Sequence, residues 1–215
     1  MFEAVLFDMD GTLLDSERFW RDAFLDLAHE RGWPGAEAFY DRLIGASEVE
    51  CLERISAWVP EGDPSEITAA WVAGVRRREG GPVPLKPGAR ELVAQLDARS
   101  VPMAVVTSSM RRDAVGLLER AELLPKLRFI IGAEDVPRHK PDPLPYVTAM
   151  ERIGCAPQAT LAFEDSPVGT RSAVASGARV VQVPDLIAPD AEILALGHLV
   201  APDLLSGARA VGLIG

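Results

Sequence analysis

The rest of this chain is organised around Ala4-Val5-Leu6-Phe7-Asp8-Met9-Asp10-Gly11-Thr12-Leu13-Leu14-Asp15-Ser16. It opens with a short apolar run that ends at a turn signal, a pattern typical of a buried strand. Asp8 and Asp10 stand two residues apart, so on an extended chain their side chains point to the same side. Both would project from the carboxyl end of the strand, where open α/β sheets bind their ligands.

Two carboxylates this close together repel each other, and a nearby cation is the simplest way to keep both ionised. Mg²⁺ accepts ligation by oxygen atoms alone. The alternative is an ordinary turn after a strand, because Asp-Gly is a common turn dipeptide. This segment alone leaves a catalytic site and a plain turn equally open, so the rest of the chain has to decide.

The composition bounds the class of protein. The chain has 215 residues, of which 48% are apolar and 25% charged, as in globular soluble proteins. Its net charge of −10 argues against a nucleic-acid or anionic-membrane binder, because phosphate groups attract basic surfaces. It leaves room for a small phosphorylated metabolite as the partner. We see no signal peptide and no run long enough to span a bilayer, and therefore expect a cytoplasmic protein.

The order of the predicted elements indicates the fold class. Residues 16–83 contain no convincing strand and are predicted to form helices, which end in a linker rich in Gly and Pro. From residue 87 the pattern alternates, with helices at 89–99, 111–121, 143–153 and 168–176 and strands at 102–107, 129–131, 160–163 and 179–183. Such alternation predicts an α/β fold with a three-layer, Rossmann-like parallel sheet. We expect a core domain of residues 1–15 and 84–215, with a small α-helical cap domain, residues 16–83, inserted after the first strand.

Polar residues follow four of the predicted strands. They are Asp8 and Asp10, then Thr107-Ser108-Ser109, then Arg138-His139-Lys140-Pro141, and then Glu164-Asp165-Ser166. Each group has an ordinary alternative: residues 107–109 and 164–166 are also good helix caps, and Lys140 could be a solvated loop lysine. Because all four follow different strands, a parallel sheet would bring them into one crevice. Together they supply what phosphoryl transfer needs, which is mostly positioning and charge neutralisation.

Four motifs in this order resemble the haloacid dehalogenase superfamily of phosphohydrolases. They read Phe7-Asp8-Met9-Asp10-Gly11-Thr12-Leu13-Leu14-Asp15-Ser16, Val105-Val106-Thr107-Ser108-Ser109, Lys140-Pro141-Asp142-Pro143 and Phe163-Glu164-Asp165-Ser166-Pro167-Val168-Gly169. The similarity runs from about residue 2 to residue 184. The helical insert looks like the small cap of the subgroup that contains β-phosphoglucomutase and sugar-phosphate phosphatases.

The resemblance implies a role for each catalytic residue. Asp8 would attack phosphorus and form an aspartyl-phosphate, a covalent intermediate that divides one difficult step into two. Asp10 would protonate the leaving oxygen and then activate the hydrolytic water. Lys140 would neutralise Asp8 and the phosphate.

The resemblance also implies a Mg²⁺ cofactor and a phosphate-binding site. The metal would be held by the Asp8 carboxylate, the Asp10 main-chain carbonyl and Asp165, with Glu164 binding directly or through water. Thr107 and the Ser108 amide would hold the phosphoryl oxygens. The cap would close over the leaving group and set specificity.

Within the subgroup we expect a Mg²⁺-dependent phosphatase, a phosphoric monoester hydrolase that acts on a small phosphorylated metabolite, with a sugar phosphate as the leading candidate. The alternative is a phosphomutase like β-phosphoglucomutase, whose cap grips a second phosphate with an arginine after a Gly-x-Ser segment. The matching segment here, Gly45-Ala46-Ser47-Glu48, carries an acid at that position, and Trp20 replaces a cap histidine of the mutase. A third possibility is a non-catalytic phosphometabolite-binding protein. The sequence allows either a monomer or a homodimer.

Overall fold

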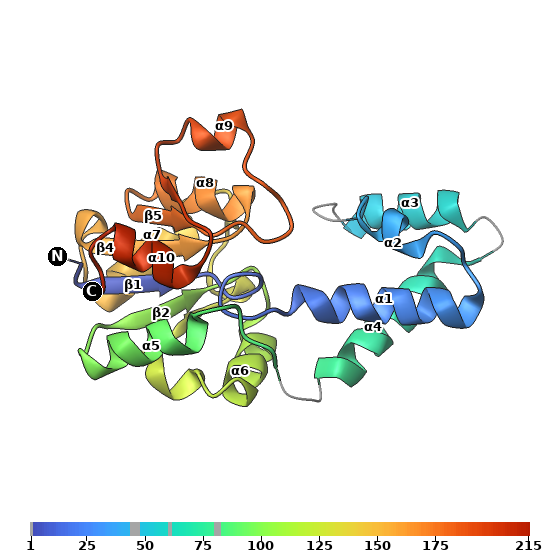
Figure 1. Cartoon of the computed structure of the whole chain (residues 1–215), viewed down its shortest axis with the longest axis horizontal. Coiled ribbons are helices and arrows are strands. Elements are labelled where there is room, and N and C mark those ends of the chain that lie inside the picture. The colour runs from blue at the N-terminus through green and yellow to red at the C-terminus, as the bar shows by residue number, and fades with distance from the viewer. Residues whose placement is uncertain (1, 44–47, 60–61, 80–82) are drawn as a thin grey trace. The chain divides into compact units, whose positions relative to one another are not determined.

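A computed structural model gives the structure of the chain and describes residues 2–43, 48–59, 62–79 and 83–215. Contacts divide the chain into two compact units (Figure 1). Unit 1 comprises Met1–Asp15 with Val83–Gly215, and unit 2 comprises Ser16–Pro82. The first strand therefore belongs to the same unit as the carboxyl-terminal two-thirds of the chain.

Unit 1 is built on a parallel six-stranded sheet, which confirms the α/β fold class. The strand order is β3-β2-β1-β4-β5-β6, with β1 at Ala4–Phe7, β2 at Met103–Val106, β3 at Ile130–Ile131, β4 at Thr160–Glu164, β5 at Arg179–Gln182 and β6 at Leu199–Val200. β1 is central, and Phe7 pairs in register with Val105 on one side and Phe163 on the other. The chain builds outward to β3 and then returns to place β4 beside β1, so the order reverses between β1 and β4. Such a reversal is where open α/β sheets bind ligands.

Helices cover both faces of this sheet, as the alternating pattern predicts (Figure 1). They are α5 at Ala89–Ala98, α6 at Arg111–Arg120, α7 at Leu144–Ile153, α8 at Pro167–Ala175, α9 at Ala191–Leu194 and α10 at Leu204–Ala210, with 3₁₀ turns at Leu124–Lys126, Ala133–Asp135 and Pro157–Ala159. Helices α7 and α8 pack together over β1 to β5, and α10 packs on β5 and α5. α10 was not predicted from the sequence.

Alternation along the strands builds the core on the two faces of the sheet. Leu6 of β1 and Ala162 of β4 lie in a buried cluster with Tyr146 and Met150 of α7. On the opposite face, the rings of Phe7 and Phe163 stack with centroids 5.4 Å apart. Both faces of β1 are therefore apolar, as expected for a central parallel strand. Asp8, directly after this buried run, is 7% exposed.

Unit 2 contains α1 at Glu17–Arg31, α2 at Ala36–Tyr40, α3 at Glu48–Trp58 and α4 at Pro64–Glu79. Among the residues of this unit that the structure describes, none lies in a strand. α1 ends at Gly32, whose left-handed conformation (φ 68°) suits a glycine C-cap. Phe24 of α1 holds the unit together, because its ring contacts those of Phe39, Tyr40, Trp58 and Trp71.

In the described ranges, no helix has both the length and the apolar character that a bilayer-spanning segment requires.

Candidate active site

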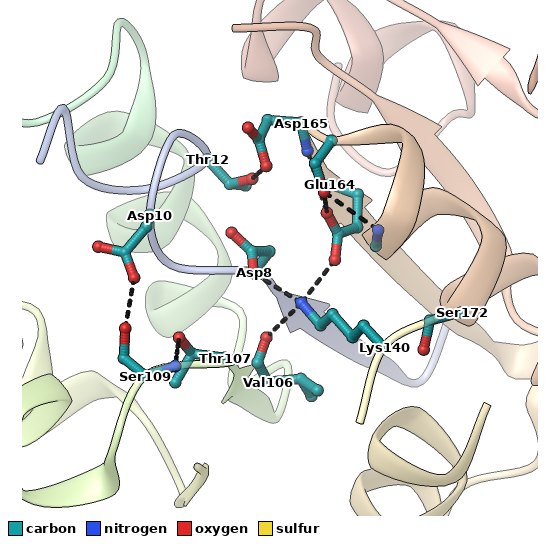
Figure 2. Close-up of polar contacts among 12 residues, drawn as sticks. Asp8, Asp10, Thr12, Val106, Thr107, Ser109, Lys140, Glu164, Asp165 and Ser172 are labelled. Atoms are coloured by element: carbon teal, nitrogen blue, oxygen red, sulfur yellow. Dashed lines mark hydrogen bonds and ion pairs between the residues drawn. The ribbon is translucent and has the colours of Figure 1, made fainter. Parts of the chain in front are cut away.

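The first site feature is a buried lysine between two buried carboxylates. Lys140 Nζ lies 2.6 Å from Asp8 Oδ1 and 2.6 Å from Glu164 Oε1 (Figure 2). It also donates a 2.9 Å hydrogen bond to the main-chain carbonyl of Val106. Asp8 follows β1, Glu164 ends β4 and Lys140 lies between β3 and α7, so the sheet brings together three residues that are far apart in the sequence.

Burial and charge determine the protonation of this trio. Burial raises the pKa of Asp8, and the Glu164 and Asp165 carboxylates raise it further, while Lys140 opposes them. Burial alone would lower the pKa of Lys140, but the charges of Asp8 and Glu164 outweigh burial and raise this pKa above its ordinary value. Lys140 is therefore a permanent cation at neutral pH. Its charge stabilises the ionised form of the buried Asp8 carboxylate.

Tyr146 is a site residue that the sequence reasoning missed. Its hydroxyl, on α7, donates a 2.6 Å hydrogen bond to Glu164 Oε1, the same oxygen that contacts Lys140. Lys140 Nζ also lies 5.2 Å from the centroid of the Tyr146 ring. The other Glu164 oxygen accepts from the Asp165 amide at 3.3 Å and from the Ser166 hydroxyl at 3.4 Å. Glu164 is thus completely buried but held by donors at both oxygens.

Asp10 lies on the other side of Asp8 from this network (Figure 2). Ser109 Oγ, from the loop after β2, donates a 2.9 Å hydrogen bond to Asp10 Oδ2. Thr107 is 5% exposed, and its hydroxyl oxygen accepts the Ser109 amide at 3.0 Å, which shapes this loop. Ser108 is exposed at the tip. The carboxyl ends of β1 and β2 therefore place Asp10, Thr107 and Ser109 in one polar group.

The helix-cap alternatives fare differently in the two loops. The alternative that residues 107–109 cap the following helix is wrong, because the N-cap residue of α6 is Met110, which makes no side-chain capping hydrogen bond with the described residues. The Glu134 carboxylate instead accepts the Arg111 amide, at 3.0 and 3.1 Å. In the loop after β4, Ser166 does cap α8, since its hydroxyl accepts the amide of Gly169 at 3.1 Å.

Asp8, Glu164 and Asp165 form an acidic triad whose ligand oxygens all lie within 4.8 Å of one another. Burial and the neighbouring Glu164 raise the pKa of Asp165 to about 8, with Lys140 opposing and Asp185 adding to the rise. Thr12 Oγ1 donates to Asp165 Oδ1 at 3.5 Å. The triad has more negative charge than Lys140 can offset. Its oxygen donors and excess charge fit a hard divalent cation such as Mg²⁺.

Asp185 borders the triad and Lys86 pairs with it; neither residue was named from the sequence. Asp185, in the loop after β5, receives Lys86 Nζ on Oδ1 at 2.6 Å. The other carboxylate oxygen of Asp185 is buried and has no hydrogen-bond partner among the residues that the structure describes. Neither residue stands in a motif, and only the pairing of β4 with β5 brings Asp185 near Asp165.

The residues expected to separate a phosphatase from a mutase are only partly visible. Residues 45–47 lie outside the described residues, and the side chain of Glu48 is not described either. Trp20 packs edge-on against Trp71 within unit 2, with ring centroids 5.5 Å apart, and its carbonyl accepts the Trp71 indole N–H at 2.8 Å. Trp20 therefore has a structural contact inside its own unit.

Comparisons with known proteins find a matching family, related sequences and similar solved structures. Residues 5–183 match the family of haloacid dehalogenase-like hydrolases. The chain is 31% identical to a phosphorylated carbohydrates phosphatase of Thermotoga maritima over 177 residues, which is 81% of this chain and 82% of that protein. It is 32% identical to a validoxylamine A 7'-phosphate phosphatase of Streptomyces hygroscopicus subsp. limoneus over 204 residues, 95% of each chain. A hydrolase of the same family from Deinococcus radiodurans R1, solved with bound phosphate and sodium, superposes with a TM-score of 0.83 at 27% identity over 98% of this chain and 94% of that one.

Proposed function

Since this chain belongs to the haloacid dehalogenase-like hydrolases and is a phosphatase of that type, we propose that it hydrolyses a small sugar phosphate with the help of Mg²⁺ and through an aspartyl-phosphate on Asp8. The observation that carries the proposal is the buried trio of Asp8, Lys140 and Glu164, with both Lys140 contacts at 2.6 Å. A carboxylate desolvated at the end of a central strand and held by a permanent cation is a well-positioned nucleophile.

In the first half-reaction an oxygen of the Asp8 carboxylate attacks phosphorus. A new O–P bond forms as the ester O–P bond to the sugar breaks, and Asp10 gives its proton to the departing sugar oxygen. Ser109, which donates to Asp10 Oδ2, orients this acid. Lys140 offsets charge on Asp8 and on the phosphoryl group, so that the negative attacking group and the negative substrate can approach.

In the second half-reaction Asp10, now ionised, takes a proton from a water molecule. The oxygen of that water attacks phosphorus, the Asp8–phosphorus bond breaks, and inorganic phosphate leaves with the carboxylate of Asp8 restored. Thr107 and the Ser108 amide, at the carboxyl end of β2, would hold the phosphoryl oxygens throughout. Glu164 serves this chemistry by keeping Lys140 between the two carboxylates.

Mg²⁺ would be held by the Asp8 and Asp165 carboxylates and the Asp10 main-chain carbonyl. When bound, it supplies positive charge that offsets the phosphoryl oxygens and the acidic triad. Glu164 would contribute to the metal site directly or through water, in addition to holding Lys140.

The substrate class rests on the relatives, whose names refer to phosphorylated carbohydrates and to validoxylamine A 7'-phosphate. Among these chemistries we propose a hexose or related polyol phosphate. We favour hydrolysis over phosphate transfer between positions of a sugar, because Glu48 stands where the mutase pattern has an arginine. An acid there would repel a second phosphate. Residues 16–82 would act as the cap that selects the leaving group.

The test is phosphate release from a panel of hexose 6-phosphates, 2-deoxyhexose 6-phosphates, β-glucose 1-phosphate, phosphoglycolate and nucleoside monophosphates, with Mg²⁺ and with a chelator. We expect Mg²⁺-dependent release from one cluster of sugar phosphates. Asp8→Asn should abolish it while leaving the fold intact. Asp97→Asn, a change of the same kind at an exposed Lys126 pair, should not. Substantial turnover by Asp8→Asn would overturn the nucleophile assignment. Isomerisation of a sugar monophosphate, primed by a bisphosphate and without net release, would replace hydrolysis by mutase activity.

A further inference from the structure

Asp185 is a mostly buried acid to which neither the motifs nor the proposed reaction assigns a role. Its side chain is 13% exposed, and Lys86 Nζ contacts only one of its two carboxylate oxygens, Oδ1. Oδ2 is shielded from solvent and lacks a hydrogen-bond partner within the described ranges. A buried carboxylate oxygen without a partner carries a large desolvation cost. Such an atom therefore points to a ligand or a water that belongs beside it.

The free oxygen of Asp185 faces the acidic triad. A Cβ atom built on Gly11 would lie 3.2 Å from Asp185 Oδ2 and 2.5 Å from Asp165 Oδ2, so both oxygens border the same small space beside the Gly11 backbone. Gly11 is in the left-handed region (φ 82°), and any side chain there would close that space. Glycine is the residue that leaves it open.

Two negative oxygens next to the same space repel each other unless something positive lies between them. Lys86 cannot do this, since it is on the opposite oxygen of Asp185. A hydrated divalent cation supplies both the positive charge and the hydrogen-bond donors that the two carboxylates lack.

We propose that Asp185 is a positioning residue of the cation site: its Oδ2 accepts a hydrogen bond from a water molecule carried by a Mg²⁺ ion at Asp165, and Lys86 holds Asp185 in the orientation that makes this possible. This inference rests on the Mg²⁺ site of the proposed function. It extends that site to β5, so that residues following β1, β4 and β5 all contribute to it. Outer partners of this kind orient ligands and are needed for full metal affinity.

The experiment is a calorimetric titration of the metal-stripped full chain with Mg²⁺, with no substrate present, for the wild type, Asp185→Asn and Asp97→Asn. Asp97 is the control, since it also pairs with a lysine, Lys126, at 2.7 Å, although this pair is more exposed than Lys86–Asp185. It lies near the end of α5 that leads into the amino end of β2, at the sheet edge opposite the triad. We expect Asp185→Asn to raise the Mg²⁺ dissociation constant by about 10- to 100-fold and Asp97→Asn to leave it unchanged.

Thermal unfolding separates this role from a purely structural ion pair. If Asp185 serves the cation, Asp185→Asn weakens Mg²⁺ binding whatever the loss of the Lys86 pair does to Tm in chelator. The increase in Tm on adding Mg²⁺ then shrinks. If the Lys86–Asp185 pair only joins two loops, Tm in chelator falls and Mg²⁺ affinity does not change. That second pattern would overturn the inference.

A second variant covers the case in which Asp185→Asn leaves Lys86 buried without a partner and the chain does not fold. The double change Lys86→Met with Asp185→Leu removes both charges, which avoids an isolated buried charge. The same 10- to 100-fold weakening of Mg²⁺ binding is expected, and wild-type affinity would contradict the inference. These titrations contain no substrate, so they test the role of Asp185 in Mg²⁺ binding. The phosphate-release panel tests the proposed phosphatase activity separately.

Discussion

The hydroxyl of Tyr146 donates a 2.6 Å hydrogen bond to Glu164 Oε1, the oxygen that also receives Lys140. Tyr146 is fully buried on α7, and its ring belongs to the core cluster on that face of the sheet. One side chain therefore joins the hydrophobic core to the charged site. Burial, followed by the charge of Glu164, raises the pKa of Tyr146 well above its usual value, so the phenol remains a proton donor.

Tyr146→Phe should lower kcat more than it changes KM. The variant keeps the ring in the core and removes only the donor to Glu164, so Glu164 and Lys140 lose orientation while the substrate contacts remain. A hydrogen bond to a charged group contributes about 1.5–3 kcal/mol, and we expect a loss of stability in that range by urea unfolding. Tyr40→Phe in unit 2 is the control for kcat. Equal kcat values for wild type and Tyr146→Phe would contradict the positioning role.

Lys140→Met should destabilise the chain strongly at neutral pH. The Lys140 side chain is 5% exposed, and its removal leaves Asp8 and Glu164 as buried charges without their cation. Breaking a buried pair in this way costs about 3–5 kcal/mol. Lys126→Met, which breaks a more exposed pair with Asp97, should cost no more than about 1 kcal/mol. Urea unfolding of both variants at pH 7 gives the two losses in free energy of unfolding. Similar losses would contradict a strong stabilisation by the buried contacts of Lys140.

Gly169→Ala and Gly116→Ala make the same change in two helices, and we expect them to change the stability of the chain in opposite directions. A Cβ atom at Gly169 would lie 2.0–2.1 Å from the carboxylate of Glu164, which is held by four donors and cannot move aside without losing them. Among the described residues, a Cβ atom at Gly116 meets only the end of Arg120, at 3.4 Å. We expect Gly116→Ala to stabilise by about 0.5–1 kcal/mol, and Gly169→Ala to destabilise and to reduce phosphate release. Thermal unfolding and activity assays measure both, and a stabilised, active Gly169→Ala would contradict the packing described here.

Without a divalent cation, stability should fall as pH rises from about 6.5 to 8. The pKa of Asp165 in the folded chain is raised to about 8, so the folded state binds a proton there that the unfolded state has already released. Stability is then lost as pH rises toward the folded pKa, by up to about 1.4 kcal/mol per pH unit for one proton. Burial lowers the pKa of His198 below its ordinary value of about 6.5, so this histidine makes stability rise with pH only below that value. The window for Asp165 therefore starts above it.

The measurement is Tm against pH in chelator and in Mg²⁺. Mg²⁺ replaces the proton at the triad, so the fall should disappear when it is present. Asp165→Asn, which has no proton to lose, should show little fall in chelator. A Tm that stays constant or rises between pH 6.5 and 8 in chelator, for the wild type, would contradict the raised pKa of Asp165.

Much of the fold could be predicted from the sequence because its signals are local. The run before Asp8 is apolar at every position since β1 is buried on both faces, and the alternation of helices and strands after residue 87 specifies a parallel sheet. The family, the α/β fold class and the phosphatase type were predicted correctly. α10 was missed, because Leu204–Ala210 is too short to show helical periodicity. The role of unit 2 as a cap stays a prediction.

Some residues of the candidate site could be named from the sequence, and others could be found only in the structure. The pattern of residues was enough to name Asp8, Asp10, Lys140, Glu164 and Asp165, because each stands in a motif at the end of a strand or in the segment after it. Their catalytic and metal-binding roles stay predictions until the variants are made. Tyr146, Lys86 and Asp185 had no such signal, since a tyrosine in a helix and a charged residue in a loop are ordinary there.

Local sequence specifies most of the strands and helices, and which residue types follow each strand, because periodicity and turn chemistry act over a few neighbouring residues. The partners come from the tertiary fold: Lys140 lies between Asp8 and Glu164, and Tyr146 donates to Glu164. Asp185 Oδ2, which has no hydrogen-bond partner among the described residues, borders the same space as Asp165 Oδ2. These contacts join residues from 18 to 132 positions apart. They depend on strand order and register, which are set by the burial of whole faces of the sheet, and no local pattern specifies them.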